Sequence, residues 1–413
     1  MLFLYNFVIN CYVLLIHTAS LFSPKAKLWV EGRKHWKAKL IQFNTQHPQG
    51  STRRIWIHCA SLGEFEQGRP LLEAIKAKYP ESQLILSFFS PSGYEIRKNY
   101  PHAALICYLP IDRKMNANTF IELVNPQIAI FVKYEFWHHY LTTLATRAIP
   151  TYLISAVFRA DQIFFKPYGA FFRKLLAKFT HIFVQDHTSF QLLKEIGCNA
   201  VTIAGDTRVD RVAQIPKEDK QLPLVAQFVQ NQKCLVAGST WPPDEALLAP
   251  ILQQAFLSDW KIIIAPHDIS ETHLKELEAV LKKDFIRFSQ YTSSTETSHR
   301  ILLIDNIGML QAIYRYGTVA YIGGGFGAGI HNTLEPIAFG LPVIFGPKYH
   351  KFEEARQLLK NGGGFSINDG KSLQQIIQSL MAEAAYTKAS KAAKGFIEEN
   401  KGSALKIMTH LFN

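Results

Sequence analysis

The sequence predicts an α/β protein built from two Rossmann-like domains. Three observations carry this prediction: a length of 413 residues, a 48% share of hydrophobic residues without a low-complexity tract, and a regular alternation of strand-like and helix-like stretches. A chain of this length is too long for one core, so two domains of roughly 150–200 residues are expected. Apolar runs that alternate with amphipathic stretches are typical of a parallel sheet covered by helices on both faces.

The first series of strand-like runs predicts a domain over residues 25–212. Each run precedes a helix-like stretch, and a long aromatic and basic helix pattern follows the fourth run. The runs are 55–60, 83–89, 129–132, 151–156, 181–186 and 200–205.

A second series predicts a second domain of the same kind over residues 233–413. A polar stretch with prolines at positions 216 and 223 separates the two series and predicts a linker over 213–232. The tail from about Leu373 has a helical pattern, and its last helix could pack back on the first domain. The strand-like runs are 233–239, 260–266, 301–306, 318–325 and 341–346.

The first 24 residues predict a membrane-anchor segment. Residues 2–22 contain no Lys, Arg, Asp or Glu, and about 21 helical residues cover a hydrocarbon core of roughly 30 Å. A cleaved signal peptide is one alternative, but a basic n-region and a small-x-small cleavage site are missing. A buried helix is the other.

A basic cluster follows the anchor directly. Such clusters stay on the cytoplasmic side and bind anionic head groups, although solvation of a helix face is the alternative. The body of the protein is therefore expected on the cytoplasmic side of a membrane. The cluster consists of Lys25, Lys27, Arg33, Lys34, Lys37 and Lys39.

Composition narrows the partners and the chemistry. Lys and Arg outnumber Asp and Glu by 45 to 33, a formal charge of +12, which suits nucleic acid, anionic lipid or a phosphorylated substrate. The five cysteines are scattered and show no CxxC spacing, which argues against a disulfide framework or a zinc site. Asp268 and Asp305 follow strands without a paired acid, so no metal site is predicted.

Candidate catalytic residues follow strands of the first domain, where ligands bind in open α/β sheets. In HCASLGEFEQGRP, small residues permit a tight turn, and Glu64 projects from the first helical turn. In KYEFW, Glu135 and Trp137 follow the run 129–132. For both acids the alternative is a charge that only complements a helix dipole. In AGDTRVDR, Arg208 is suited to neutralise a phosphate or a carboxylate.

Candidate nucleotide contacts follow strands of the second domain. The segment GGGFGAGIHNTLEP has a glycine-dense loop whose backbone N–H groups could cradle a phosphate, and Asn332, Thr333 and Glu335 could reach a ribose or base. A structural glycine turn is the alternative. His267 follows the strand 260–266, and two interpretations fit it equally well: it contacts a ligand, or it is a solvated loop residue.

Ordered motifs along almost the whole chain resemble those of the 3-deoxy-D-manno-octulosonic acid (Kdo) transferase family. The resemblance implies a GT-B fold with two domains facing a central cleft, and an enzyme that moves Kdo from CMP-Kdo to the lipid A precursor, lipid IVA. It implies no cofactor, no metal and no nucleic-acid partner, and a place on the cytoplasmic side of the inner membrane. The motifs are WIHCASLGEFEQGRPLL, YLPID, EFW, QDHTSFQLLKEIG, AGDTRVD, AGSTWPPDE, IDNIGML and GGGFGAGIHNTLEP.

The resemblance also implies roles for individual residues. Glu64 would be the general base, Glu135 an acid that stabilises the transition state, and Arg208 a basic residue near the reacting groups. The CMP contacts would be Pro266, His267, Ile307, Gly308, Met309, Asn332, Thr333, Leu334 and Glu335.

Four positions depart from the family pattern. His267 stands where the family has Arg, and Met309 stands where it has Glu. Lys133 replaces an acid, and Arg208 replaces Lys. Charge is therefore kept at 208 and lost at 309, where a contact through the backbone at Gly308 is expected instead.

Two other functions fit the same motifs less completely. One is a GT-B enzyme that uses a nucleotide-diphosphate sugar. The other is a non-catalytic, membrane-bound receptor for an anionic lipid or nucleotide, which would not need the acids Glu64 and Glu135.

Overall fold

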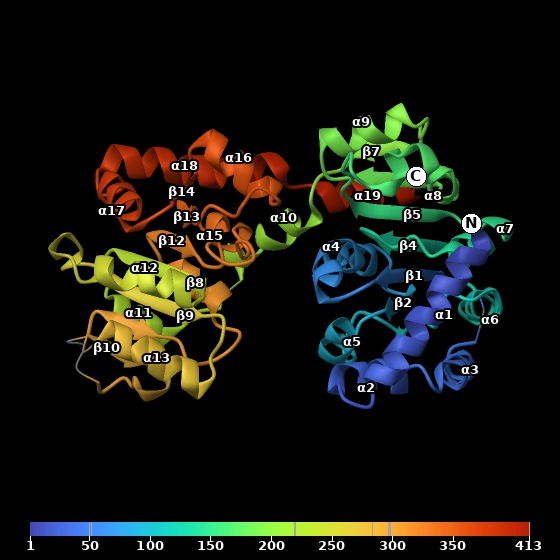
Figure 1. Ribbon diagram of the computed structural model, residues 1–413, viewed down its shortest axis with the longest axis horizontal. Helices are drawn as coiled ribbons and strands as arrows, with labels where there is room; N and C mark the ends of the chain where they lie inside the picture. Colours follow the sequence, from blue (N-terminus) through green and yellow to red (C-terminus); the bar gives the residue numbers. More distant parts are fainter. Residues whose placement is uncertain (49, 51, 219, 283, 296–298, 413) are drawn as a thin grey trace. The chain divides into compact units, whose positions relative to one another are not determined.

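A computed structural model of the protein describes residues 1–48, 50, 52–218, 220–282, 284–295 and 299–412. The chain forms two compact units (Figure 1). Unit 1 comprises Met1–Asp210 and Gly402–Asn413, and unit 2 comprises Arg211–Lys401.

Unit 1 is built on a parallel sheet that has seven strands within the described residues. Successive residues of a strand point to opposite faces, and here both faces are buried: Trp56 belongs to one apolar cluster, Ile55 and Ile57 to the other. This explains the near-continuous apolar runs of the sequence. In sheet order the strands are β3 (Leu105–Tyr108), β2 (Gln83–Phe88), β1 (Arg54–Cys59), β4 (Ile128–Val132), β5 (Thr151–Ala156), β6 (His181–Val184) and β7 (Val201–Ile203).

Helices cover both faces of this sheet, and the C-terminal helix returns to it. Ile407, Met408 and Leu411 of that last helix belong to the apolar cluster beneath one face. The helices are α1 (Leu2–Ala19), α2 (Pro24–Glu31), α3 (Trp36–Gln46), α4 (Leu62–Lys78), α5 (Pro91–Arg97), α6 (Lys114–Val124), α7 (His138–Thr146), α8 (Ala170–Leu176), α9 (His187–Glu195), α10 (Thr207–Val212) and α19 (Ser403–Phe412).

Helix α1 lies across the carboxyl ends of the strands in unit 1 (Figure 1). Its Tyr5 contacts residues that follow β3 and β4, while Phe3, Leu14 and Leu15 of the same helix are exposed. With 18 residues, α1 has the length and composition to cross a membrane.

Unit 2 repeats the architecture with a second parallel sheet of seven described strands. In sheet order these are β10 (Phe285–Arg287), β11 (Ile301–Leu303), β9 (Lys261–Pro266), β8 (Cys234–Thr240), β12 (Val319–Ile322), β13 (Val343–Phe345) and β14 (Gly364–Ser366). The helices are α11 (Pro223–Val229), α12 (Pro242–Leu252), α13 (Glu271–Leu281), α14 (Leu310–Ile313), α15 (Leu334–Ala338), α16 (Glu353–Asn361), α17 (Gly370–Ser379) and α18 (Glu383–Asn400).

The predicted α/β class is confirmed, but the structure adds strands and shortens a helix. Strands β3, β10 and β14, absent from the sequence prediction, are three or four residues long and lie at sheet edges. The long helix expected after β5 is instead two 3-10 turns, η1 (Ile163–Phe165) and η2 (Pro167–Gly169), followed by α8. A proline begins the second turn, and a side chain at Gly169 would collide with the carbonyl of Ile163. The stretch 213–232 contains η3 (Ile215–Lys217) and α11, whose Val225 and Phe228 are buried.

Candidate active site

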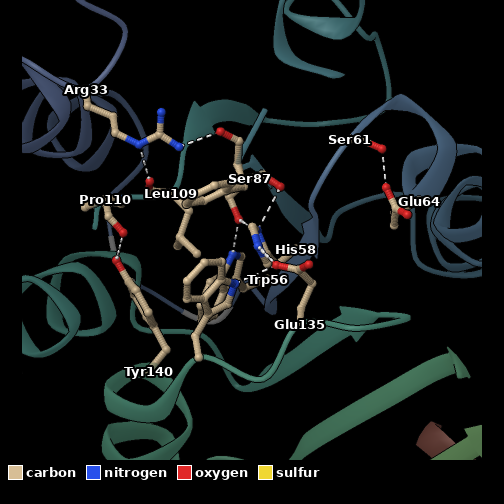
Figure 2. A network of polar contacts seen from close by, with 12 residues as sticks. Arg33, Trp56, His58, Ser61, Glu64, Ser87, Leu109, Pro110, Glu135 and Tyr140 are labelled. Atoms are coloured by element: carbon tan, nitrogen blue, oxygen red, sulfur yellow. Dashed lines mark hydrogen bonds and ion pairs between the residues drawn. The ribbon is translucent and has the colours of Figure 1, made fainter. Parts of the chain in front are cut away.

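Glu64 lies in a capped turn directly after β1. Ser61 is the N-cap of α4, and its hydroxyl oxygen accepts a hydrogen bond from the N–H of Gly63 at 3.2 Å. The same hydroxyl donates to the carboxylate of Glu64, as Figure 2 shows. The carboxylate is therefore oriented by a neighbour while its side chain stays partly accessible to solvent.

Glu135 occupies the loop 133–137 between β4 and α7, and its surroundings differ from those of Glu64. Only 7% of Glu135 is exposed, and its Oε2 accepts hydrogen bonds from Trp137 Nε1 at 2.5 Å and His58 Nε2 at 2.9 Å. Two donors on one buried oxygen hold the carboxylate in a single position. The loop begins at Lys133 with φ +73°, a left-handed conformation that is costly for a side chain other than glycine.

His58 connects Glu135 to the middle of the sheet. It lies on β1, is fully buried, and its Nδ1 is 2.9 Å from Ser87 Oγ on the neighbouring strand β2. That hydroxyl also accepts a hydrogen bond from Trp56 Nε1 at 2.8 Å. Figure 2 shows these side chains as one chain of polar contacts that ends at Glu135.

The two acids share the carboxyl end of β1. Burial raises the pKa of the Cys59 thiol, and the negative charges of Glu64 and Glu135 raise it further. The geometry also places both acids near the end of β1: Glu135 Oε2 is 2.9 Å from Nε2 of His58, the residue before Cys59, and Glu64 lies in the first turn of the helix that follows β1. Strands β1 and β4, after which the two acids stand, are neighbours in the sheet.

Arg208 belongs to the same unit and lies in the first turn of α10. The hydroxyl of Thr207, beside it, donates to the carbonyl of Gln67 on α4, the helix that carries Glu64. The guanidinium of Arg208 donates to Asp206 Oδ2 through Nε at 2.8 Å and Nη2 at 2.6 Å. Asp206 thus orients the guanidinium and compensates part of its charge.

The residues expected to contact a nucleotide all lie in unit 2, at the end of β9 or after β9, β11 and β12. Pro266 is the buried last residue of β9. The exposed ring of His267 stacks on Trp241, with ring centroids 4.6 Å apart, and on His331, also at 4.6 Å. His331 directly precedes Asn332, so the ends of β9 and β12 meet here.

The segment 307–309 offers a ligand main-chain groups rather than polar side chains. Ile307 is 87% exposed, and Gly308 has φ +92° with no atom within 4 Å of a Cβ added to it. Met309 is the N-cap of α14 and makes no side-chain capping bond. An open glycine at this point allows close approach of a ligand to the main chain.

The segment 332–335 begins a helix of only five residues, α15. Asn332 Oδ1 accepts from the N–H of Leu334 at 3.0 Å. Leu334 is buried, and the charge of Glu335 contributes to the raised pKa of buried Tyr314, after desolvation. Thr333 is fully buried, and its Oγ1 has no hydrogen-bond partner within the described residues.

The glycine-dense loop before this helix is shaped by close backbone packing. A side chain at Gly323 would lie 2.1 Å from the carbonyl oxygen of Ser239, and one at Gly325 would lie 2.5 Å from the nitrogen of Gly346. The N–H of Gly324 donates to Asp244 Oδ2 at 2.8 Å. Packing therefore accounts for several of these glycines, and at least one N–H expected for phosphate binding already has a partner.

Several residues near these sites were not predicted from the sequence. His58 and Asp112 are buried polar residues, and Trp241 and His331 flank His267. The prediction was wrong for Arg33, which was placed in the basic cluster but is a buried cation with 8% of its surface exposed. Arg33 donates to the carbonyls of Leu109 at 2.9 Å and Phe89 at 2.6 Å, and burial lowers its pKa to about 9. Among these residues, only His58 could have been found from the sequence, because it is a polar residue inside an apolar run.

The family model and the related sequences that match this chain carry the same family description. Residues 34–211 match the family model of 3-deoxy-D-manno-octulosonic-acid transferase (kdotransferase). A 3-deoxy-D-manno-octulosonic acid transferase of Aquifex aeolicus is 27% identical over 350 residues, covering 83% of this chain and 90% of the relative. The enzyme of that name from Chlamydophila psittaci is 25% identical over 412 residues, covering 96% and 94%.

Solved structures support the fold. The UDP-GlcNAc 2-epimerase of Neisseria meningitidis, bound to UDP-GlcNAc, superposes with a TM-score of 0.65 at 14% identity, covering 87% of this chain and all of that one. An epimerase of Listeria monocytogenes, described as a UDP-N-acetylglucosamine 2-epimerase, gives 0.63 at 13% identity, with 87% and 96% covered. At these identities the likeness concerns the GT-B-like fold alone.

Proposed function

Because this chain belongs to the 3-deoxy-D-manno-octulosonic acid (Kdo) transferase family, we propose that it transfers Kdo from CMP-Kdo to lipid IVA. The transfer would take place at the cytoplasmic side of the inner membrane, as a step of lipopolysaccharide core biosynthesis. The observation that carries the proposal is the pair of acids in unit 1: Glu64, oriented and accessible, and Glu135, buried and fixed, both near the end of β1.

In the proposed reaction Glu64 is the general base. Its carboxylate takes the proton of the acceptor hydroxyl while the hydroxyl oxygen bonds to the anomeric carbon of Kdo. The bond from that carbon to the phosphate oxygen breaks, and CMP leaves with the electron pair. One displacement of this kind inverts the anomeric centre, and base assistance typically contributes about 10²–10⁴ in rate.

Glu135 and Arg208 would act through fixed charge. Positive charge develops at the anomeric carbon as the phosphate departs, and a buried carboxylate held by His58 and Trp137 needs no reorganisation to stabilise it. Arg208, oriented by Asp206, would face negative charge near the reacting groups. The partial compensation by Asp206 limits its contribution.

Unit 2 would bind the CMP moiety. The stacked rings of Trp241, His267 and His331 offer an aromatic surface, and the open backbone at Gly308 offers N–H and C=O groups. Asn332, Thr333 and Glu335 supply polar groups. A departing monophosphate carries less charge than a diphosphate, so we propose that these groups and a protein cation suffice without a metal ion.

Helix α1 would hold the enzyme at the membrane. Its exposed apolar residues and the five exposed lysines of the basic cluster match an apolar core beside anionic head groups. The acceptor is a lipid, so attachment at this surface places the enzyme where its substrate is.

Donor choice tests the proposal. The full-length protein in detergent is incubated with lipid IVA and either CMP-Kdo or UDP-N-acetylglucosamine, and nucleotide release is followed. We expect acceptor-dependent release of CMP alone. Release of UDP would favour a nucleotide-diphosphate sugar transferase, and tight lipid binding without release of either nucleotide would favour a receptor.

A further inference from the structure

The acid Glu135 is held from two sides, and only one of them is the sheet. His58 fixes its carboxylate from β1. On the other side, the loop 133–137 runs directly into α7, so the position of the first turn of α7 limits where the loop can go.

Asp112 fixes that first turn. It follows β3, is 2% exposed, and accepts hydrogen bonds from the N–H groups of His139 and Tyr140, each at 3.1 Å. These are two of the N–H groups that a helix leaves unpaired at its start. A buried carboxylate from elsewhere in the chain therefore does the capping that Trp137, the N-cap residue, does not do with its own side chain.

Helix α1 supplies the third donor to Asp112. The hydroxyl of Tyr5 donates to Asp112 Oδ2 at 2.5 Å and accepts a bond from the N–H of His138 at 3.3 Å. The next residue, Asn6, has its Oδ1 2.8 Å from His139 Nε2. Two consecutive residues of α1 thus contact His138 and His139, the first two residues of α7.

We propose that α1 is a positioning element of the active site: Tyr5, through Asp112, fixes the start of α7 and with it the loop that carries Glu135. The segment with the composition of a membrane anchor thereby also sets the geometry of an acid in the reaction. This inference rests on the proposed role of Glu135 for its catalytic consequence, but the link from Tyr5 to α7 does not depend on that role.

The test compares two changes of the same chemistry on the same helix in the full-length protein. Tyr5→Phe removes the hydroxyl that bonds Asp112. Tyr12→Phe removes a hydroxyl that makes no hydrogen bond within the described residues, and it is the matched control. Amide hydrogen exchange at His139 and Tyr140 is measured together with kcat and KM for Kdo transfer.

We expect Tyr5→Phe to speed exchange of the two amides by about tenfold, since a hydrogen bond to a charged group is worth at least that in an equilibrium constant. The value of kcat should fall by about three- to tenfold, while KM for the donor stays within about twofold. In a protein that already carries Asp112→Asn, Tyr5→Phe should have no additional effect on exchange or kcat, because both changes act through the same carboxylate.

Equal exchange rates in Tyr5→Phe and Tyr12→Phe would overturn the inference, whatever the enzyme transfers. Faster exchange in Tyr5→Phe with unchanged kcat would show that α7 loosens without consequence for Glu135, which also contradicts the proposal. Absence of Kdo transfer by every variant and by the wild type would count against the proposed function, while the exchange comparison still decides the link.

Discussion

Replacing His58 by phenylalanine tests whether Glu135 depends on the sheet beneath it. The change keeps a buried ring in β1 and removes the donor 2.9 Å from Glu135 Oε2. A hydrogen bond to a charged group contributes about 1.5–3 kcal/mol to stability. For a domain of this size that corresponds to a fall in Tm of roughly 3–12 °C.

A double-mutant cycle separates this contact from general packing damage. Glu135→Met removes the carboxylate and keeps similar length, so His58→Phe should cost less in that background than alone. We expect a coupling free energy of at least about 1 kcal/mol between the two positions, measured by thermal and urea unfolding. His58→Gln, whose amide can still donate, should recover part of the lost stability and activity.

Additive effects would refute this reasoning. If the penalties for His58→Phe and Glu135→Met sum to within about 0.5 kcal/mol of the double variant, the contact contributes nothing specific. The same conclusion follows if His58→Gln is no better than His58→Phe.

Two further predictions concern a titrating ring and a buried hydroxyl. Burial, and after it the charge of His410, lowers the pKa of His181 to about 4, whereas the pKa in the unfolded chain is about 6.5. Because the unfolded state binds the proton more tightly, the free energy of unfolding falls as the pH drops from about 6.5 to about 4. His181→Phe should flatten this dependence in urea midpoints, and an unchanged slope contradicts it. Thr333→Val removes a buried hydroxyl that has no partner within the described residues, so stability should hold or rise; calorimetry should show weaker CMP binding, and unchanged binding would remove Thr333 from the nucleotide site.

The elements that sequence reasoning predicts best are those whose signal is local. Strands β1, β2, β4 and β5 are long apolar runs because both of their faces are buried. The turn at Glu64 is also local, since Ser61 and Gly63 stand within three positions of it.

The contacts that sequence reasoning missed join distant positions. His58 and Glu135 are separated by 77 positions, and Tyr5 and Asp112 by 107. Composition marked Tyr5 as part of an apolar anchor, and only the tertiary arrangement shows that it also bonds a buried carboxylate. The edge strands β10 and β14 were missed because their side chains are only partly buried, so neither segment forms an apolar run.

Mass spectrometry of the lipid product tests the central claim most directly. Wild-type protein, CMP-Kdo and lipid IVA should give a lipid whose mass increases by whole Kdo units. Glu64→Gln, which keeps the side-chain shape and removes the base, should fold with an unchanged Tm and retain less than about a tenth of the transfer. A wild-type product without added Kdo would contradict the proposed reaction, and a fully active Glu64→Gln protein would contradict the assignment of the base.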